Sequence, residues 1–380
     1  MKVIIAIDSF KGSISSSEGS KAIADGIREV YPDAEVLSFP LADGGEGTVE
    51  ALVQATSGEL IKVKVTGPLN KPVNAIYGIL GDGNTAVIEV AEACGLPLVP
   101  DESRNPLHTT TFGVGEMVLD ATQRGCREFI IGLGGSATND AGVGMLQALG
   151  FRFTDKEGNE VGFGGAVLQD IEKIHTDKVH PQLAECTFKL ACDVNNYLYG
   201  KEGAAYVFGP QKGASAEEVE QLDQGLQHFA EVVYKELGKD IHNVQGAGAA
   251  GGLGAAFHGF LEAELQSGIE LVLSTLKMEE HVAGADFVIT GEGKLDGQTA
   301  LGKVPVGVAN LAQQFNVPVI ALAGSVPKDA ENLNELGITS YFSIVNQPMT
   351  VQDAMEKDTT YENLRTTTKQ LFRLIKSVKQ

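Results

Sequence analysis

The sequence is poor in cysteine and in long apolar runs. A chain of 380 residues with so few thiols cannot rest on a disulfide framework, and no two of them have CxxC spacing. We therefore expect free, buried thiols in a reducing cytoplasm. Only five apolar residues lie between Lys2 and Asp8, fewer than the about 7–15 of a secretory signal peptide. No run approaches the roughly 20 apolar residues of a membrane helix. The cysteines are Cys94, Cys126, Cys186 and Cys192.

Basic residues are also scarce. The chain has 29 Lys and Arg against 50 Asp and Glu, which gives a net charge of −21. Nucleic acids and anionic membrane surfaces are recognised by basic patches, so neither is an expected partner. An anionic substrate would have to meet a local positive potential supplied by the site itself. The histidines show no HxH or HExxH spacing and the chain has no GxSxG motif, so neither a zinc site nor an α/β-hydrolase is expected.

The composition is that of a globular protein. Hydrophobic residues make up 43% of the chain and charged residues 21%, which is enough to bury a core. The length predicts two domains. Glycine is plentiful at 46 residues, and in a globular chain this indicates many tight backbone turns, often close to ligands.

The chain opens with a β-α-β pattern. Val3–Ile7 is a β-branched run that predicts a strand buried on both faces. Ser15 and Glu18 fit a capping box before a helix that is stopped by Pro32, and Glu35–Phe39 predicts the next strand. A helix between two such strands indicates a parallel sheet.

The pattern changes in the middle of the chain. Between residues 60 and 90, alternating apolar segments separated by turn signals predict antiparallel strands. A strand over Phe129–Leu133 is followed by a glycine turn and a helix from about Asp140 to Leu149. Ser215–Leu237 carries one apolar stripe at helical spacing, and Gly238 stands at the expected C-cap.

Alternating strands and helices return from about residue 285 and end in a helix over Tyr361–Val378. The same pattern at both ends, with a different one between, predicts an insertion. The expected fold is α/β, with a flavodoxin- or Rossmann-like parallel-sheet domain over residues 1–60 and 275–380. A second, mixed α/β domain is expected over residues 61–274.

Five polar or glycine-rich segments follow predicted strands. In parallel sheets, ligands bind beyond the carboxyl ends of the strands, and glycines there let backbone N–H groups approach a phosphate. A single loop of this composition is also typical of an ordinary turn, and only the presence of five of them in one chain favours a binding site. The segments are Asp8–Ser13, Ala42–Thr48, Gly134–Asp140, Ala191–Asn196 and Gly291–Thr299.

These loops carry side chains that suit phosphoryl transfer. The cations are Lys11 and Lys294. Carboxylates of this kind suit Mg²⁺, which prefers oxygen ligands and keeps several waters. Backbone N–H groups, carboxylates for a metal and one or two lysines are what phosphoryl transfer requires. The acidic residues are Asp8, Asp43, Glu46, Asp193, Glu292 and Asp296.

Two nucleotide-binding patterns fit poorly. Gly297–Val304 nearly matches a P-loop, but Val304 stands where a hydroxyl must ligate Mg²⁺, and the preceding predicted strand ends too early. Gly246, Gly248 and Gly251 match the dinucleotide pattern GxGxxG, but the segment before them is a poor strand. We interpret these glycines as the start of a tightly packed helix, with a phosphate-binding nest as the alternative.

Four motifs, taken in order, resemble the type I glycerate kinase family. They are DSFKGS after the first strand, ADGGEGT after the second, GLGGSATNDAGVGMLQALG at 132–150 and TGEGKLDGQT at 290–299. The resemblance extends from Lys2 to the C-terminal helix. It implies an ATP-dependent kinase acting on D-glycerate with Mg²⁺. It also implies a flavodoxin-like domain with a second α/β domain inserted, and an active site in the cleft between them. Family members are generally associated with 2-phosphoglycerate and some are named 3-kinases, so the sequence leaves the product open, with 2-phosphoglycerate favoured.

We expect Lys11, Asp43 and Asp193 to be catalytic. Asp43 or Asp193 is the candidate general base, and the same two residues are the candidate metal ligands. Lys11 would neutralise charge on the transferring phosphoryl group, with Lys294 as the alternative. The structural alternatives are a helix N-cap for Asp43 and a solvated surface lysine for Lys11.

Substrate and phosphate binding is expected from the remaining loop residues. Ser136, Ala137 and Thr138 are expected to begin a helix whose N–H groups bind the glycerate carboxylate or a phosphate. Asp296 and Gln298 are expected to hold substrate hydroxyls. The other expected binding residues are Asp8, Ser9, Gly44, Gly45, Glu46, Gly134, Gly135, Gly291, Glu292, Gly293 and Lys294.

The expected partners are D-glycerate and ATP, without nucleic acid or a membrane, and a homodimer is left open. Three alternatives remain at this point. One is a dehydrogenase, supported only by GAGAAG. Another is a non-catalytic nucleotide-binding protein. The third is a kinase for a different small hydroxy acid, such as a tartronate- or sugar-acid-like substrate.

Overall fold

The structure is a computed structural model, and it describes residues 1–297 and 299–378. The chain divides into two compact units. Met1–Asp43 and Ile269–Gln380 form the first, which we call the terminal unit, and Gly44–Gly268 forms the second, which we call the inserted unit. The terminal unit is therefore built from both ends of the chain.

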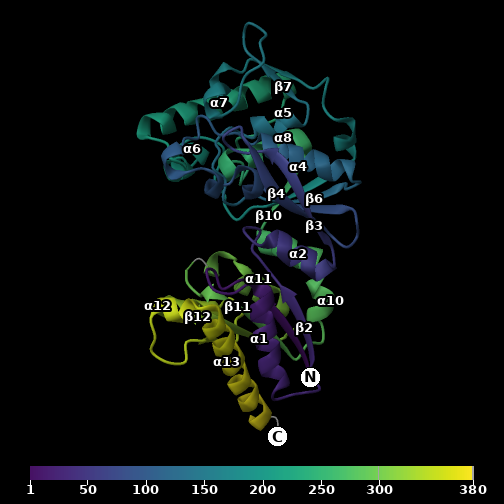
Figure 1. Cartoon of the computed structure of the whole chain (residues 1–380), viewed down its shortest axis with the longest axis vertical. Helices are drawn as coiled ribbons and strands as arrows, with labels where there is room; N and C mark the ends of the chain where they lie inside the picture. Colours follow the sequence, from purple (N-terminus) through teal and green to yellow (C-terminus); the bar gives the residue numbers. More distant parts are fainter. Residues whose placement is uncertain (298, 379–380) are drawn as a thin grey trace. The chain divides into compact units, whose positions relative to one another are not determined.

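The terminal unit contains a five-stranded parallel sheet (Figure 1). The order across the sheet is β13-β12-β11-β1-β2. Numbered within this unit alone, the order is 2-1-3-4-5, which is that of flavodoxin-like folds. The predicted α/β class with a parallel sheet is confirmed. The strands are β1 (Lys2–Ile7), β2 (Glu35–Pro40), β11 (Phe287–Lys294), β12 (Val319–Ser325) and β13 (Ser340–Ser343).

Two long helices lie side by side in the terminal unit, α1 and α13 (Figure 1). Val3, Ile5 and Ile7, alternate residues of β1, belong to the same buried cluster as residues of these helices, as the two-residue period of a strand requires. Gly26 of α1 allows the close approach, because a Cβ there would lie 2.4 Å from the carbonyl oxygen of Arg365. The helices are α1 (Ser16–Arg28), α9 (Gly268–Thr275), α10 (Met278–Val282), α11 (Val304–Gln313), α12 (Val351–Met355) and α13 (Lys357–Val378).

The inserted unit contains a six-stranded mixed sheet in the order β10-β9-β6-β5-β4-β3. β3, β4 and β5 pair antiparallel, as predicted, and β5, β6, β9 and β10 pair parallel. Phe129 of β6 stands opposite Phe188 of β9, and their rings stack with centroids 4.8 Å apart. The strands are β3 (Glu59–Thr66), β4 (Pro72–Ile79), β5 (Thr85–Glu89), β6 (Glu128–Gly132), β9 (Thr187–Ala191) and β10 (Glu264–Gln266), with β7 (Arg152–Thr154) and β8 (Lys173–His175) forming a separate hairpin.

The helices of the inserted unit include the predicted amphipathic one. α7 begins with a capping box at Ser215 and ends at Gly238, whose φ is 68°. The glycines of the GAGAAG segment, which we interpreted as the start of a helix, precede α8. The residues between α7 and Gly248 form no strand, so the dinucleotide pattern lacks the strand that it requires. The helices are α2 (Thr48–Thr56), α3 (Ala91–Cys94), α4 (Phe112–Gln123), α5 (Val143–Ala148), α6 (Ala204–Phe208), α7 (Ala216–Leu237) and α8 (Leu253–Leu261).

The units divide at Asp43 and Gly268 rather than at the predicted residues 60 and 275. The difference lies mainly in α2, which the prediction placed with the parallel-sheet domain. In the structure α2 packs on β4 and β5, so the antiparallel strands and the helix before them belong to one unit.

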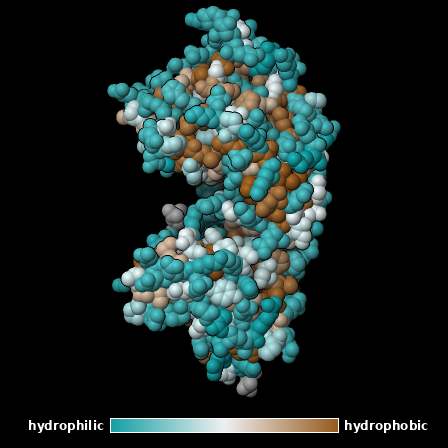
Figure 2. Space-filling model, viewed as in Figure 1, coloured by the Kyte–Doolittle hydropathy of each residue, from teal (hydrophilic) through white to brown (hydrophobic). Residues whose placement is uncertain are grey.

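The surface is largely hydrophilic on the face shown in Figure 2, in keeping with the acidic composition. Among the described residues, no helix is both long enough and apolar enough to span a membrane. All four cysteines are free thiols, and Cys94 and Cys126 are buried.

Candidate functional site

In the terminal unit, the predicted site residues gather at the carboxyl edge of the sheet. Asp8 follows β1, Asp43 follows β2, and Gly291 and Glu292 lie within the last part of β11. The strand order reverses between β1 and β11, which is where open α/β sheets bind their ligands. The N–H of Asp8 donates to the carbonyl of Gly291 at 2.9 Å, so these residues meet at that point.

Asp8 is a half-buried carboxylate with a raised pKa. Burial raises its pKa to about 6, and the neighbouring charge of Asp43 adds to the rise. The N–H of Ser9 donates to Asp8 Oδ1 at 2.6 Å and, with the charge of Lys11, opposes the shift. A carboxylate with a pKa near neutrality can hold or release a proton under working conditions.

Glu292 is a second carboxylate of this kind. It is buried, and burial raises its pKa to about 7. The hydroxyl of Thr299 donates a short hydrogen bond to Glu292 Oε1, and Lys303 also opposes the shift, whereas Asp8 and Asp296 add to it. The sequence had not singled out Thr299 or Lys303. Both lie in the near-match to a P-loop, which begins after β11 has ended at Lys294 and contains a short turn of helix at Thr299–Leu301.

The two predicted lysines of the terminal unit differ in their surroundings. Lys11 is exposed on the loop after β1, and Gly293 lies against its backbone: a Cβ on Gly293 would be 3.5 Å from the Lys11 nitrogen. Lys294 is also exposed, but it forms an ion pair with Asp296 at 3.0 Å. Lys11 therefore fits the predicted role of a positioned cation better than Lys294.

The structural alternative for Asp43 is wrong. The N-cap of α2 is Gly47, with φ of 91° and no side-chain cap, so Asp43 does not cap that helix. Among the described residues there is no cluster of three or more metal-binding side chains. Asp8 and Asp43 nevertheless fit Mg²⁺, because the charge of Asp43 disfavours ionisation of Asp8 and a cation would relieve this, and Mg²⁺ in kinases is held by only one or two carboxylates together with substrate phosphates.

The inserted unit has a second polar edge, where β5, β6 and β9 end. Gly134 and Gly135 are exposed, and Ser136, Ala137 and Thr138 are buried. The expectation that Ser136–Thr138 begin a helix is wrong, because Ser136 instead forms an isolated bridge with Gly95. Gly135 has φ of 74°, a conformation that glycine adopts without strain.

The helix begins later because of Asp140. This carboxylate is fully buried and accepts hydrogen bonds from the N–H groups of Gly142 and Gly144 and from the N–H and hydroxyl of Thr111. Burial raises its pKa, and these hydrogen bonds oppose the rise. Asp140 therefore fixes the start of α5 at Val143, three residues after the predicted position.

Two further charged residues of the inserted unit were missed by the sequence reasoning. Glu89, at the end of β5, accepts the N–H of Val49 in α2 at 3.0 Å, and burial raises its pKa to about 7. Lys212 is a buried lysine whose Nζ donates to Ser136 Oγ at 2.9 Å and to the carbonyl of Thr138 at 2.6 Å. Glu89 could have been found as an acid closing a buried strand, whereas Lys212 lies in a glycine–proline turn that indicates a surface residue.

The remaining predicted residues lie on both units. Asp193 is exposed in the inserted unit, where its Oδ1 accepts the N–H of Gly268 at 3.0 Å. Gly44 is buried, Gly45 is half-buried and Glu46 is exposed, all in the loop before α2. Gln298 lies outside the residues that the structure describes.

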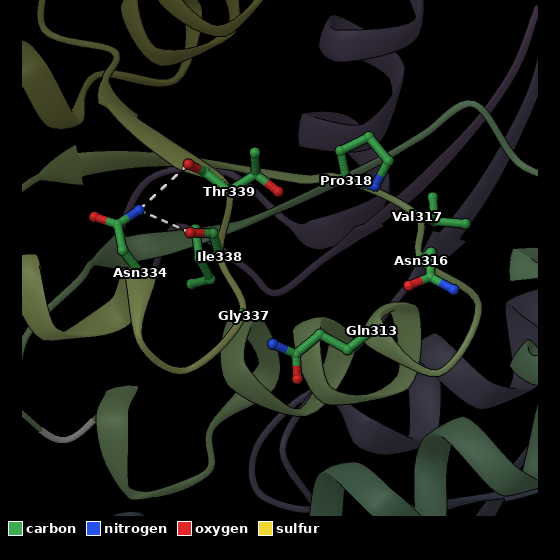
Figure 3. A pocket seen from close by; sticks show the side chains of 8 residues that line it. All are labelled: Gln313, Asn316, Val317, Pro318, Asn334, Gly337, Ile338 and Thr339. Atoms are coloured by element: carbon green, nitrogen blue, oxygen red, sulfur yellow. Dashed lines mark hydrogen bonds between the residues drawn. The ribbon is translucent and has the colours of Figure 1, made fainter.

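One open cavity of about 470 Å³ lies at the other edge of the terminal sheet (Figure 3). Its walls include Val317 and Pro318 before β12 and Gly337–Thr339 before β13, with Asn334 donating to the carbonyls of Ile338 and Thr339. These are the amino ends of the strands, opposite the edge where such sheets bind ligands. The cavity is therefore not part of the candidate site.

Comparison with known proteins identifies the fold and the family. Residues 3–376 match the glycerate kinase family. The chain is 50% identical to glycerate 2-kinase of Escherichia coli (strain K12) over 96% of this chain and 95% of that protein. It is 49% identical to a glycerate kinase of Bacillus subtilis (strain 168), over 95% of this chain and 94% of that protein.

A crystal structure from Salmonella typhimurium LT2, of a protein provisionally named glycerate kinase 2, superposes with a TM-score of 0.93 at 47% identity. It covers 100% of this chain and 99% of that chain. The agreement extends over both units, so the dehydrogenase alternative is excluded. The chain belongs to the glycerate kinase family and is a kinase.

Proposed function

We propose that this glycerate kinase transfers the γ-phosphoryl group of ATP to D-glycerate, with Mg²⁺, and forms 2-phosphoglycerate. The observation that carries the proposal is the meeting of Asp8, Asp43 and Lys11 at the switch point of the terminal sheet, where Asp8 interacts with both neighbours. Carboxylates and a lysine at that edge are what phosphoryl transfer needs. The name of the Escherichia coli relative, glycerate 2-kinase, supports the 2-phospho product.

In the proposed reaction, a hydroxyl oxygen of glycerate forms a bond to the γ-phosphorus. The bond from that phosphorus to the oxygen bridging it to the β-phosphate breaks, and ADP leaves. Asp43 takes the hydroxyl proton. Asp8 is the alternative base, because its pKa of about 6 is close to working pH. Lys11 stabilises the charge on the transferring group.

Mg²⁺ would neutralise the negative charge of the phosphates when bound. Asp43 is the proposed ligand in the terminal unit, with Asp8 beside it, and Asp193 is the other candidate that the sequence offers. Glu292 lies beside Asp8 as a second carboxyl group that is partly protonated near neutral pH. It can therefore accept or donate a hydrogen bond to a substrate hydroxyl.

The predicted binding loops of the inserted unit would hold an anionic group of a substrate. Gly134 and Gly135 expose backbone at the end of β6, and no acceptor in the described part of the chain takes their N–H groups. Such free N–H groups bind carboxylate or phosphate oxygens.

We also propose that the enzyme works in a reducing cytoplasm. Cys94 and Cys126 are buried and unpaired, and burial raises the pKa of both thiols. Protonated, buried thiols are unreactive and suit a compartment without disulfide formation.

A direct coupled assay tests the function. The chain is given ATP, Mg²⁺ and D-glycerate, and the product is passed to enolase without phosphoglycerate mutase. We expect phosphoenolpyruvate to form, because enolase accepts 2-phosphoglycerate. A signal that requires added mutase would assign the 3-phospho product instead. Faster ATP consumption with a tartronate- or sugar-acid-like compound than with D-glycerate would overturn the proposed substrate.

A further inference from the structure

The inserted unit buries a lysine that has no carboxylate partner. Lys212 closes the short helix Pro210–Lys212 and is only 3% exposed. Among the described residues, no carboxylate oxygen lies within 4.0 Å of its Nζ. Asp140 acts on it electrostatically but forms no ion pair with it, and burying a charge without a direct ion-pair partner costs free energy. A neutral side chain could hold the same turn at lower cost, so the charge calls for an explanation.

The hydrogen bonds of Lys212 lead to the glycine-rich loop after β6. An ammonium group can only donate, so Ser136 Oγ and the carbonyl of Thr138 are both acceptors. Because Ser136 accepts this bond, its own hydroxyl proton stays available as a donor to another group. The exposed glycines Gly134 and Gly135 precede it directly.

A neighbouring side chain in the same loop is also without a partner. Asn139 is 1% exposed, and neither its amide nitrogen nor its amide oxygen has a hydrogen-bond partner among the described residues. Buried amides are nearly always paired in folded proteins. This unpaired amide follows directly after Thr138, whose carbonyl accepts from Lys212, and indicates that the loop is built to receive a polar group.

We propose that Lys212 is the buried cation of an oxyanion subsite in the inserted unit. As a positioning residue, it orients the Ser136 hydroxyl and the Gly134–Thr138 loop to bind a carboxylate or phosphate group. The inference rests on the proposed function for the nature of the ligands: the oxyanion is either the carboxylate of glycerate or a phosphate of the nucleotide.

The titration of Lys212 gives a second signature. Burial lowers its pKa to about 8, and Cys94 from α3 and Asp140 from the loop before α5 oppose the shift. The backbone of Arg104 also packs against the following Gly213. Burial raises the pKa of Cys94 to about 12, so that thiol does not titrate over the range in which Lys212 loses its proton.

The test measures binding rather than turnover, so it does not depend on the enzyme assay. Calorimetry on the full chain would record the Kd of D-glycerate alone and of ADP alone, for the parent, Lys212→Met and Ser136→Ala. Lys178→Met, at an exposed lysine of the same unit, is the matched control. We expect Lys212→Met to weaken one of the two ligands by about 10–100-fold, as the loss of a charge-assisted hydrogen bond does. Ser136→Ala should weaken the same ligand less.

The affected ligand assigns the oxyanion: loss for glycerate means the carboxylate, and loss for ADP means a phosphate. Unchanged binding of both ligands by a folded Lys212→Met would overturn the proposal. The proposal would also be overturned if Lys212→Met bound both ligands more weakly only because its Tm had fallen. If Lys212→Met does not fold, the parent is titrated from pH 7 to about 9.5, which spans the lowered pKa. Affinity should fall with a midpoint near 8, and constant affinity for both ligands would overturn the proposal. Failure of the proposed function would instead appear as no ATP consumption by the parent.

Discussion

The two sheets of this chain both end in polar edges, but the groups at those edges differ. At the terminal edge, Asp8 and Glu292 have pKa values raised toward neutrality and Lys11 reaches solvent. At the inserted edge, Asp140 and Lys212 are fully covered, and their hydrogen bonds shape a glycine-rich turn. Carboxyl groups with pKa values near neutrality suit proton transfer, whereas a buried carboxylate and ammonium with several fixed hydrogen bonds suit the shaping of a binding loop. The proposed proton transfer therefore belongs to the terminal edge, and the proposed oxyanion subsite belongs to the inserted edge.

The largest effect should come from removing the metal. Excess EDTA should abolish turnover, because one or two lysines in an acidic chain cannot by themselves neutralise the phosphates of ATP. Added Mg²⁺ should restore it. The measurement is ATP consumption with D-glycerate. Full turnover in EDTA would contradict the proposed role of the carboxylates at the terminal edge as metal ligands.

Asp43→Asn should reduce kcat by about 10²–10⁴-fold, as expected for the loss of a general base or metal ligand. Asn preserves the shape, and Gly47 rather than Asp43 caps α2, so Tm should stay close to that of the parent. Asp33→Asn, at an exposed position of the same unit, is the control. If Asp43→Asn turns over normally while Asp193→Asn or Asp8→Asn does not, the base lies elsewhere.

Lys11→Ala should lower kcat by about 10²–10³-fold, the usual worth of a positioned charge in the transition state, and should change the KM for glycerate much less. Lys294→Ala should cost less, since that lysine is paired with Asp296. Lys21→Ala on the exposed side of α1 is the control. An equal loss for both loop lysines would contradict the distinction between them.

Asp140→Asn should destabilise the inserted unit by about 2–3 kcal/mol, because an amide nitrogen would replace one acceptor oxygen among four N–H and O–H donors. Asp170→Asn, at an exposed position of the same unit, should change little. Urea unfolding followed by circular dichroism would measure the difference. A stability equal to that of the parent would show that the buried charge does not organise the turn.

Glu89→Gln should flatten the pH dependence of stability. Burial raises the pKa of Glu89 from 4.5 to about 7, so between these values the folded chain binds more protons than the unfolded chain. The free energy of unfolding therefore falls as the pH rises through this window. Relative to the parent, Glu89→Gln should therefore gain about 1–2 kcal/mol more in free energy of unfolding at pH 8 than at pH 4.5. Parallel profiles for Glu89→Gln and the parent would contradict the assignment.

Much of the fold could be predicted from local patterns. The β-branched run at Val3–Ile7 forms β1, and the capping boxes at Ser15 and Ser215 begin α1 and α7. These signals are contained within one element, so no tertiary contact was needed to read them. The unit boundary is different, because only the packing of α2 on β4 and β5 decides where α2 belongs.

The candidate site could be predicted only in part. Asp8, Asp43 and Asp193 follow strands, and that placement can be read from the sequence. The start of α5 depends on positive φ values at Ala141 and Gly142. A positive φ is common for glycine, but no sequence pattern predicts it for Ala141. Lys212 lies between glycines and a proline and would normally be assigned to the surface. Its burial comes from the tertiary packing of distant segments.

The pairing of β1 with β11 has a consequence for how the protein is made. β1 is a central strand with neighbours on both sides, β2 and β11. On the ribosome, β2 follows after α1, but β11 emerges only after the whole inserted unit. Until then the apolar edge of β1 is unprotected, and such edges invite aggregation. We therefore expect the inserted unit to fold first. Until β11 emerges, the nascent amino-terminal segment would depend on a chaperone to stay unaggregated and able to fold.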